Sequence, residues 1–376
     1  MTLGCYANLL RCFDGMFRRN IVKVVLSKSE EVHPRDRDTL QRINASPSAR
    51  ALVTESFQDS SNLIKMFASD TSTVYTDKNA ENVLKVFNRD PKSAFLGTVE
   101  MGVYAKSADL PHTPKVRHAY SSPQLSFLIM GHLGMDAFEI TQQGLHRDYY
   151  TWELMVVTLV NTLARLHETG ALHGDVKLEN VTFDGKEWHF IDFGLAEQHR
   201  NSVTFSGTFP YVLPHYGGMR DTVNFRSVDD KKRAADCFAL CLTLLAFAGV
   251  DVDSGGKAPC IPPHCGNGED TEICRGTARI SITPYCMIKG DAANFTKCIW
   301  PEMPTNARGE ALTRALSEVV LSQLDVSFKY LIWGPHSRTC RYAGKSPYQA
   351  SARANIFDAW DNLVSLTKPP PFITPA

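Results

Sequence analysis

The 376-residue sequence contains no run of eighteen or more apolar residues, the length that suggests a membrane-spanning helix. Its best candidate, residues 237–250, is fourteen residues long and predicts a buried helix instead. The start of the chain lacks the basic segment, apolar core and small-residue cleavage site of a signal peptide. We therefore expect an intracellular protein, cytoplasmic or nuclear, with no membrane partner.

Net charge is also absent, because Lys plus Arg equals Asp plus Glu at 40 each. Global charge therefore gives no reason to expect nucleic acid as a partner. Paired CxxC motifs are missing as well, although five of the ten cysteines fall in one segment together with His264. Ordinary reduced cysteines are the expected state, and a zinc site is the alternative. The five cysteines are Cys260, Cys265, Cys274, Cys286 and Cys298.

Hydrophobic patterns divide the chain into a β-rich part and a helical part. Before residue 135 the runs ARALVTE, NLIKMF and QLSFLIM are β-like, and only residues 77–89 show a helical pattern. Later segments have apolar residues at helical spacing. The helices are predicted at 149–170, 233–249, 310–324 and 354–367.

We therefore expect an α+β protein with a small β-rich lobe and a larger helical lobe. The length is sufficient for two such cores. The Gly-, Pro- and Cys-rich segment 251–308 predicts an irregular insertion in the second lobe. The predicted boundaries are 1–39 for an N-terminal extension, 40–345 for the domain (40–135 and 136–345 for its lobes), and 346–376 for a C-terminal helix and Pro-rich tail.

Two short motifs combine chargeable side chains with apolar neighbours. ALHGDVKLEN (171–180) places Asp175, Lys177 and Asn180 close together, and the strand-like WHFID ends at Asp192. Because the two aspartates flank a hairpin-like connection, we expect their carboxylates to converge. Carboxylate and amide oxygens suit Mg²⁺. Phosphoryl transfer needs a metal, a cation near the transferred group and a carboxylate that orients the attacking hydroxyl.

HGDVKLEN resembles the catalytic loop of the protein kinase superfamily, H-R-D-L-x-x-x-N, and the DFG motif follows intact at 192–194. Gly174 stands where that loop has Arg. The resemblance implies a bilobal kinase fold that uses ATP and Mg²⁺ to phosphorylate a protein substrate. By resemblance, Asp175 orients the substrate hydroxyl and Lys177 faces the γ-phosphate. Asn180 and Asp192 hold the metal in the same reading.

Three further segments resemble parts of that family. NLIKMF resembles the strand with the ATP-binding lysine, which would be Lys65, and Glu81 on the predicted helix would pair with it. A solvated ion pair is the alternative. GTFPYVLPH (207–215) resembles the end of the activation segment and would place Thr208 near the catalytic loop. Asp236 resembles the aspartate that steadies this loop through backbone hydrogen bonds, with a helix N-cap as the alternative.

The glycine-rich nucleotide loop of the family is missing. About fifteen residues before Lys65 the chain reads INASPSARA (43–51), with small residues in place of the expected glycines. Such residues still let backbone N–H groups approach phosphate, but the freedom of Gly at positive φ is lost. We reject GTVEMG (97–102) as this loop because it follows both Lys65 and Glu81. The residues predicted to line the nucleotide are Asn44, Ser46, Ala49 and Ala51.

Two other functions stay open beside a serine/threonine kinase. The missing glycines favour a pseudokinase scaffold, and His-Gly-Asp also occurs in small-molecule phosphotransferases of the aminoglycoside type. Lys177 and the Gly-Thr pair at 207–208 favour a protein substrate. His-Gly-Asp and the hinge-like FLIMGHLGMDAFE resemble the casein kinase 1 and vaccinia-related kinase group, and a divergent kinase of a large DNA virus fits as well. The oligomeric state is left open.

Overall fold

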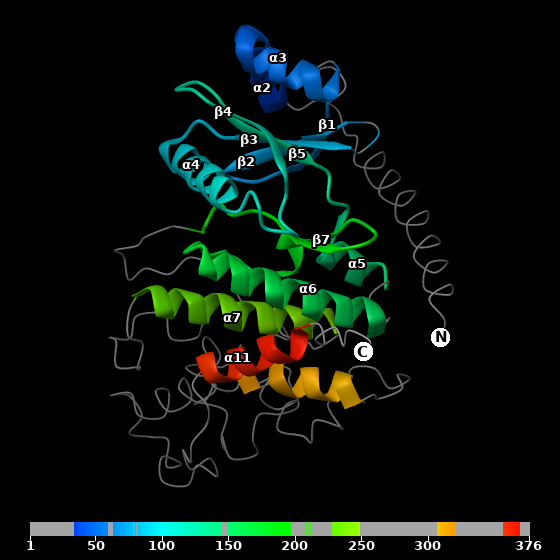
Figure 1. Ribbon diagram of the computed structural model, residues 1–376. Coiled ribbons are helices and arrows are strands. Elements are labelled where there is room, and N and C mark those ends of the chain that lie inside the picture. The colour runs from blue at the N-terminus through cyan, green and yellow to red at the C-terminus, as the bar shows by residue number, and fades with distance from the viewer. Residues whose placement is uncertain are drawn as a thin grey trace, which may run out of the picture. The chain divides into compact units, whose positions relative to one another are not determined.

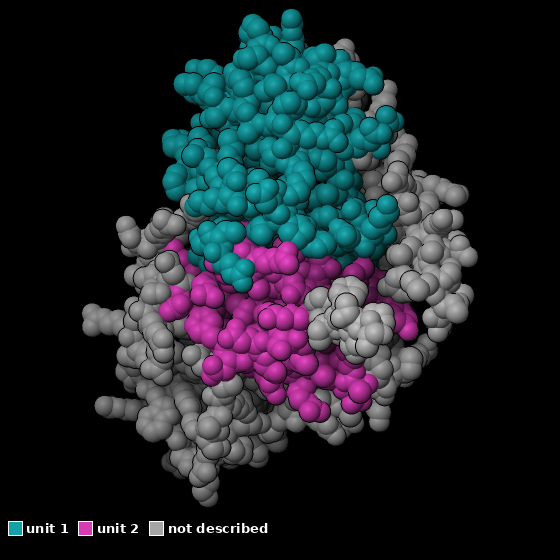
Figure 2. Space-filling view, viewed as in Figure 1, with its two compact units in different colours: residues 1–140, 168–173, 179–198 teal, residues 141–167, 174–178, 199–376 magenta. Residues whose placement is uncertain are grey.

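The chain forms two compact units, which Figure 2 colours separately. Unit 1 comprises Met1–Ile140, Glu168–His173 and Glu179–Gln198, and the remaining residues form unit 2. No helix in the described part of the chain is long and apolar enough to span a bilayer. Residues 251–306 of the predicted insertion, including its five cysteines, lie outside the described part of the chain. This computed structural model describes residues 34–58, 63–77, 79, 81–144, 149–196, 208, 211, 228–248, 307–316, 318–320 and 356–368.

Unit 1 is built on a five-stranded antiparallel sheet with strand order β1-β2-β3-β5-β4 (Figure 1). Strand β3 lies at the centre, between β2 and β5. Alternate side chains of β3 point to opposite faces of the sheet, and both faces are covered. The strands are β1 Ile64–Ala68, β2 Ser72–Thr76, β3 Asn82–Phe87, β4 Val116–Ser121 and β5 Ser126–Gly131.

Helices α2 (Pro34–Ala45) and α3 (Pro47–Phe57) cover one face of this sheet (Figure 1). Their buried side chains meet Leu84 and Val86 of β3 in one hydrophobic core. The prediction of a β-like run at ARALVTE is therefore wrong. Ser46 and Pro47 start a helix there, and the residues buried in it follow at intervals of four. These are Ala49, Val53 and Phe57.

Helix α4 (Pro91–Lys106) packs on the other face of β3 (Figure 1). Asp90 caps it, accepting the Ser93 N–H at 2.9 Å, and Pro91 occupies the first turn. The predicted helix over 77–89 is wrong, because this segment contains β3. GTVEMG, rejected as the nucleotide loop, lies inside α4.

A smaller, three-stranded sheet includes the two strands that lie between the 171–180 motif and Asp192 in the sequence. Its strands are β6 (Met135–Asp136), β7 (Val181–Phe183) and β8 (Trp188–Phe190), in that order, and α5 (Ala137–Gln142) follows β6. β7 and β8 form the predicted hairpin. The Ile191 N–H donates to the Asn180 carbonyl at 3.0 Å, so Asn180 and Asp192 lie at its open end.

Unit 2 contains the helices α6 (Tyr149–Glu168), α7 (Val228–Phe247) and α11 (Ile356–Thr367). The Trp152 indole donates to the Leu244 carbonyl at 3.0 Å and ties α6 to α7. The Asn161 amide reaches the Thr367 carbonyl at 3.2 Å and ties α6 to α11. The helices predicted at 149–170, 233–249 and 354–367 are confirmed.

Candidate active site

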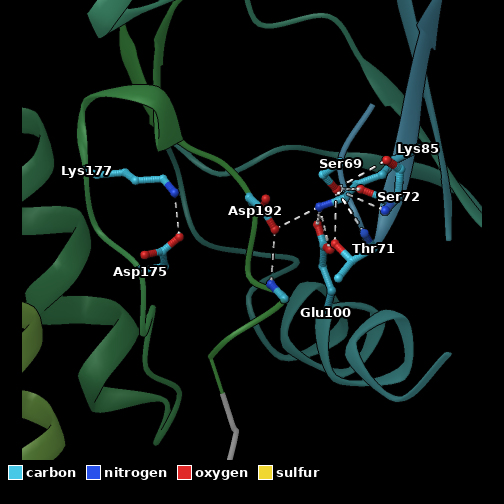
Figure 3. Close-up of polar contacts among 9 residues, drawn as sticks. Ser69, Thr71, Ser72, Lys85, Glu100, Asp175, Lys177 and Asp192 are labelled. Atoms are coloured by element: carbon cyan, nitrogen blue, oxygen red, sulfur yellow. Dashed lines mark hydrogen bonds and ion pairs between the residues drawn. The ribbon is translucent and has the colours of Figure 1, made fainter. Parts of the chain in front are cut away.

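Lys85 lies at the centre of a buried ion cluster in unit 1 (Figure 3). Its Nζ is 2.8 Å and 3.0 Å from the two carboxylate oxygens of Glu100, and 2.8 Å from Oδ1 of Asp192. The Glu100 side chain is 1% exposed. A carboxylate so deeply buried depends on its cation, because an unpaired charge in the interior is strongly destabilising.

The two carboxylates compete for this one ammonium group. Burial acts to lower the pKa of Lys85, but the charges of Asp192 and Glu100 outweigh it and raise the pKa, so Lys85 stays protonated. Burial raises the pKa of Glu100 to about 7 against the opposing charge of Lys85. Burial also acts upward on the pKa of Asp192, but Lys85 prevails and lowers it. Asp192 is therefore the member that keeps its negative charge most firmly.

The side-chain chemistry of Asp192 and Asn180 fits a metal ion. Asp192 has φ +63°, a left-handed conformation that is strained for an aspartate and typical of functional positions. Lys85 and the Gly194 N–H both bind its Oδ1, and no hydrogen bond from the described residues reaches Oδ2. The Asp192 side chain is 47% exposed. Together with the amide oxygen of Asn180 it offers hard oxygen ligands of the kind that Mg²⁺ prefers.

Three predicted residues meet in unit 2. Lys177 Nζ lies 2.9 Å from Oδ2 of Asp175 and donates to the Thr208 hydroxyl at 2.8 Å. That hydroxyl donates to Oδ1 of Asp175 at 2.8 Å. The expected proximity of Thr208 to the catalytic loop is thus confirmed. Since Asp175 and Asp192 belong to different units, the convergence of their carboxylates stays a prediction.

Asp236 supports the loop that carries Asp175. Its Oδ1 accepts the backbone N–H of Gly174 at 2.9 Å, and its Oδ2 lies 3.0 Å from Nε2 of His167. The predicted backbone hydrogen bond is therefore confirmed. The N-cap alternative is wrong, because Asp236 lies inside α7, which begins at Val228.

The predicted ion pair between Lys65 and Glu81 is wrong. Lys65 lies on β1 at the edge of the sheet, and Glu81 precedes β3 in a segment that is not helical. The pair that the structure forms is Lys85–Glu100. A usable signal was present: VLKVF (83–87) is a short apolar run with β-branched residues around a lysine, and Asp90-Pro91 marks a helix start soon after it.

The predicted nucleotide loop at 43–51 is wrong as well. Asn44 lies in α2, Ser46 caps α3, and Ala51 belongs to α3. Ala49 is fully buried in the core and no ligand can reach it. The segment that stands about fifteen residues before the paired lysine is instead the turn between β1 and β2, residues 69–72.

This turn has no glycine and is closed by its own hydrogen bonds (Figure 3). The Ser69 hydroxyl accepts the N–H groups of Thr71 at 3.2 Å and Ser72 at 3.1 Å. Asn88, directly after β3, donates from Nδ2 to the Asp70 carbonyl at 2.7 Å and from its N–H to the Thr71 carbonyl at 2.9 Å. None of residues 69–72 has positive φ, so this turn does not need the conformational freedom of glycine.

The family model described as "Protein kinase domain" matches residues 65–248, which include the sheet, the ion cluster and the catalytic loop. The chain contains a protein kinase domain. The predicted resemblance and the predicted α+β kinase fold are thereby confirmed.

Curated relatives agree with this assignment. "Serine/threonine-protein kinase AtPK1/AtPK6" of Arabidopsis thaliana is 29% identical over 116 residues, 28% of this chain and 24% of the relative. "Probable serine/threonine-protein kinase fnkB" of Dictyostelium discoideum is 48% identical over 68 residues, 16% and 13% of the two chains. "Serine/threonine-protein kinase 1" of Orgyia pseudotsugata multicapsid polyhedrosis virus is 32% identical over 119 residues, 31% and 43%. In each case the chain spans less than half of the relative's length.

The kinase domain gives the ion cluster a defined place. In this family a lysine on the third strand pairs with a glutamate on the following helix. Lys85 and Glu100 occupy these positions on β3 and α4. The turn at 69–72 then occupies the place of the glycine-rich loop, between the first two strands.

Proposed function

We propose that this chain is an ATP-dependent serine/threonine protein kinase, which transfers the γ-phosphoryl group to a hydroxyl of a protein substrate. The observation that carries the proposal is the cluster of Lys85, Glu100 and Asp192. A buried lysine between two carboxylates is weak evidence for stability, since apolar residues of similar size often serve the fold as well. Its presence supports a role in binding the phosphates of ATP.

Each polar group then has a role in positioning or charge stabilisation. Glu100 holds the ammonium group of Lys85 toward the α- and β-phosphates. Asn180 and Asp192 would bind Mg²⁺, which neutralises charge on the phosphates. Asp175 accepts a hydrogen bond from the attacking hydroxyl, and Lys177 faces the γ-phosphate.

Thr208 supports a protein substrate rather than a small molecule. Its hydroxyl joins Asp175 to Lys177, so the chain that follows the catalytic loop is bound to the loop by hydrogen bonds. In protein kinases the segment around such a threonine lies where the peptide substrate docks. This link favours the kinase over the phosphotransferase of the aminoglycoside type.

The pseudokinase alternative has one observation in its favour. The Ser69 hydroxyl occupies backbone N–H groups of Thr71 and Ser72, which a glycine-rich loop would offer to phosphate. The cluster around Lys85 opposes this alternative, because a scaffold that binds no nucleotide has no use for a buried lysine between two carboxylates.

Transfer of label from γ-labelled ATP to a generic protein mixture tests the proposal. Asp175→Asn should lower the transfer rate by about 100-fold or more, since general-base catalysis contributes roughly 10²–10⁴. Glu179→Gln is the matched control: it removes a carboxylate from the same loop at an exposed position. It should leave transfer within about twofold of the wild type.

The alternatives predict different results. Nucleotide binding without any transfer would support the pseudokinase, and label only on small amino alcohols would support the small-molecule enzyme. Equal loss in Asp175→Asn and Glu179→Gln would remove the assigned role of Asp175.

A further inference from the structure

Gly97 of α4 lies directly against the ring of Phe87. A Cβ atom added at Gly97 would stand 2.7 Å from Cγ and 2.8 Å from Cδ2 of Phe87. Real Cβ contacts are essentially never that short. The Phe87 ring is 3% exposed, so it has no solvent to move into, and one of the two elements would have to shift.

This contact lies next to the Lys85–Glu100 ion pair on both elements. Phe87 follows Lys85 by two residues on β3, so both side chains point to the same face of the sheet. Glu100 follows Gly97 by three residues on α4, so both lie on the same face of the helix. β3 and α4 are thus joined by a steric contact and an ionic contact, one turn of helix apart.

We propose that Gly97 is a positioning residue for the kinase reaction, because its missing side chain lets α4 approach β3 closely enough for Glu100 to hold Lys85. The inference rests on the proposed function of Lys85. Glycine inside a helix is less favourable than alanine by about 1 kcal/mol, so its presence at a buried position needs a reason. The ring of Phe87 supplies that reason.

Gly102 provides a matched control on the same helix. It is exposed, and a Cβ atom there would meet nothing within 4 Å. Gly102→Ala and Gly97→Ala make the same chemical change in α4 and gain the same helix propensity. Only the substitution at Gly97 meets the Phe87 ring.

The experiment measures the Lys85 amine directly. Trace acetylation with acetic anhydride, followed by mass spectrometry, reports how fast Lys85 reacts relative to Lys65 in the same molecule. Gly97→Ala should raise this ratio at least about fivefold, because an amine no longer held at 2.8 Å and 3.0 Å by the two Glu100 oxygens is freer to attack the reagent. Gly102→Ala should leave it within about twofold. No change at Gly97→Ala, or equal changes in both variants, would overturn the proposal.

Transfer kinetics and a second background complete the test. Gly97→Ala should lower kcat/KM for ATP by roughly 10–100-fold, the usual consequence of a misplaced positioning group. In a Phe87→Ala background, the same substitution should change both readouts less than about twofold, because the steric conflict is gone. An undiminished effect there would show that the ring is not responsible.

The labelling result does not depend on catalysis. If wild-type protein transferred no phosphate, the proposed function would fail while acetylation of Lys85 still tested the role of Gly97. If transfer were present but insensitive to Gly97→Ala, the positioning role would fail alone. The Phe87→Ala pair also covers the case in which Gly97→Ala by itself does not fold.

Discussion

Replacement of Lys85 by Met should have two separable effects, on catalysis and on stability. Met keeps most of the aliphatic stem but removes the ammonium group shared by Glu100 and Asp192. Transfer should fall by about 10²–10³, the usual loss when one preorganised charge-stabilising donor is removed. Lys65→Met is the matched control in the same sheet, and we expect transfer within about threefold of the wild type.

The stability effect should depend on pH, and its sign follows from Glu100. Burial already raises the pKa of Glu100 to about 7, and loss of the opposing Lys85 charge raises it further. In the variant, native Glu100 therefore keeps its proton at pH values above 4.5, the ordinary pKa of a glutamate, at which the unfolded chain has released it. Stability therefore falls as pH rises through this window.

The expected loss of stability at each pH follows from how deeply Glu100 and Asp192 are buried. At pH 8.5, Glu100 is left charged in the interior or takes up a proton at unfavourable pH, and we expect Lys85→Met to cost about 3–5 kcal/mol. At pH 5.5, Glu100 is protonated and only the contact with the half-exposed Asp192 is lost, at about 1 kcal/mol. Lys65→Met should cost less than about 1 kcal/mol at both values.

Urea unfolding of the wild type and both variants at pH 5.5 and 8.5 measures these differences. A loss for Lys85→Met that is independent of pH would contradict the assigned role of Glu100. A loss of transfer in Lys65→Met as large as that in Lys85→Met would instead support Lys65 as the ATP-binding lysine.

Two further predictions concern the turn and the catalytic loop. Asn88→Ala should raise KM for ATP roughly fivefold with little change in kcat, because it removes the 2.7 Å bond to the Asp70 carbonyl, worth about 1 kcal/mol. Arg89→Ala, at the exposed neighbouring position, should change KM less than twofold, and equal effects would contradict the turn's role. Asp236→Ala should lower the urea stability by about 2–4 kcal/mol, since the half-buried Gly174 N–H and the buried His167 lose their acceptor. Unchanged stability would show that this support is dispensable.

The catalytic loop could be predicted from the sequence because its chemistry is local. Asp175, Lys177 and Asn180 lie within six residues, and Asp192 follows a short hairpin, so spacing alone carries the information. The long helix α6 could be predicted equally well, because its apolar residues keep helical spacing over twenty residues.

The paired lysine was missed because β3 is buried on both faces. Its apolar residues therefore do not alternate with polar ones, and together with Ala80 they imitate the spacing of a helix. With Lys65 as the paired lysine, the expected loop falls on residues 43–51, which end α2 and begin α3. The pairing role of Glu100 could not be predicted for a related reason. Gly97 and Gly102 weaken the helical pattern of α4 in the sequence, although Gly97 is needed for packing against Phe87.

The most direct test of the account is a crystal structure of this chain with Mg²⁺ and a non-hydrolysable ATP analogue. We expect Lys85 Nζ within hydrogen-bond distance of the α- or β-phosphate, Glu100 still paired with it, and Asn180 and Asp192 oxygens about 2.1 Å from the metal. A nucleotide whose phosphates contact Lys65 instead, or a metal bound without Asp192, would contradict it.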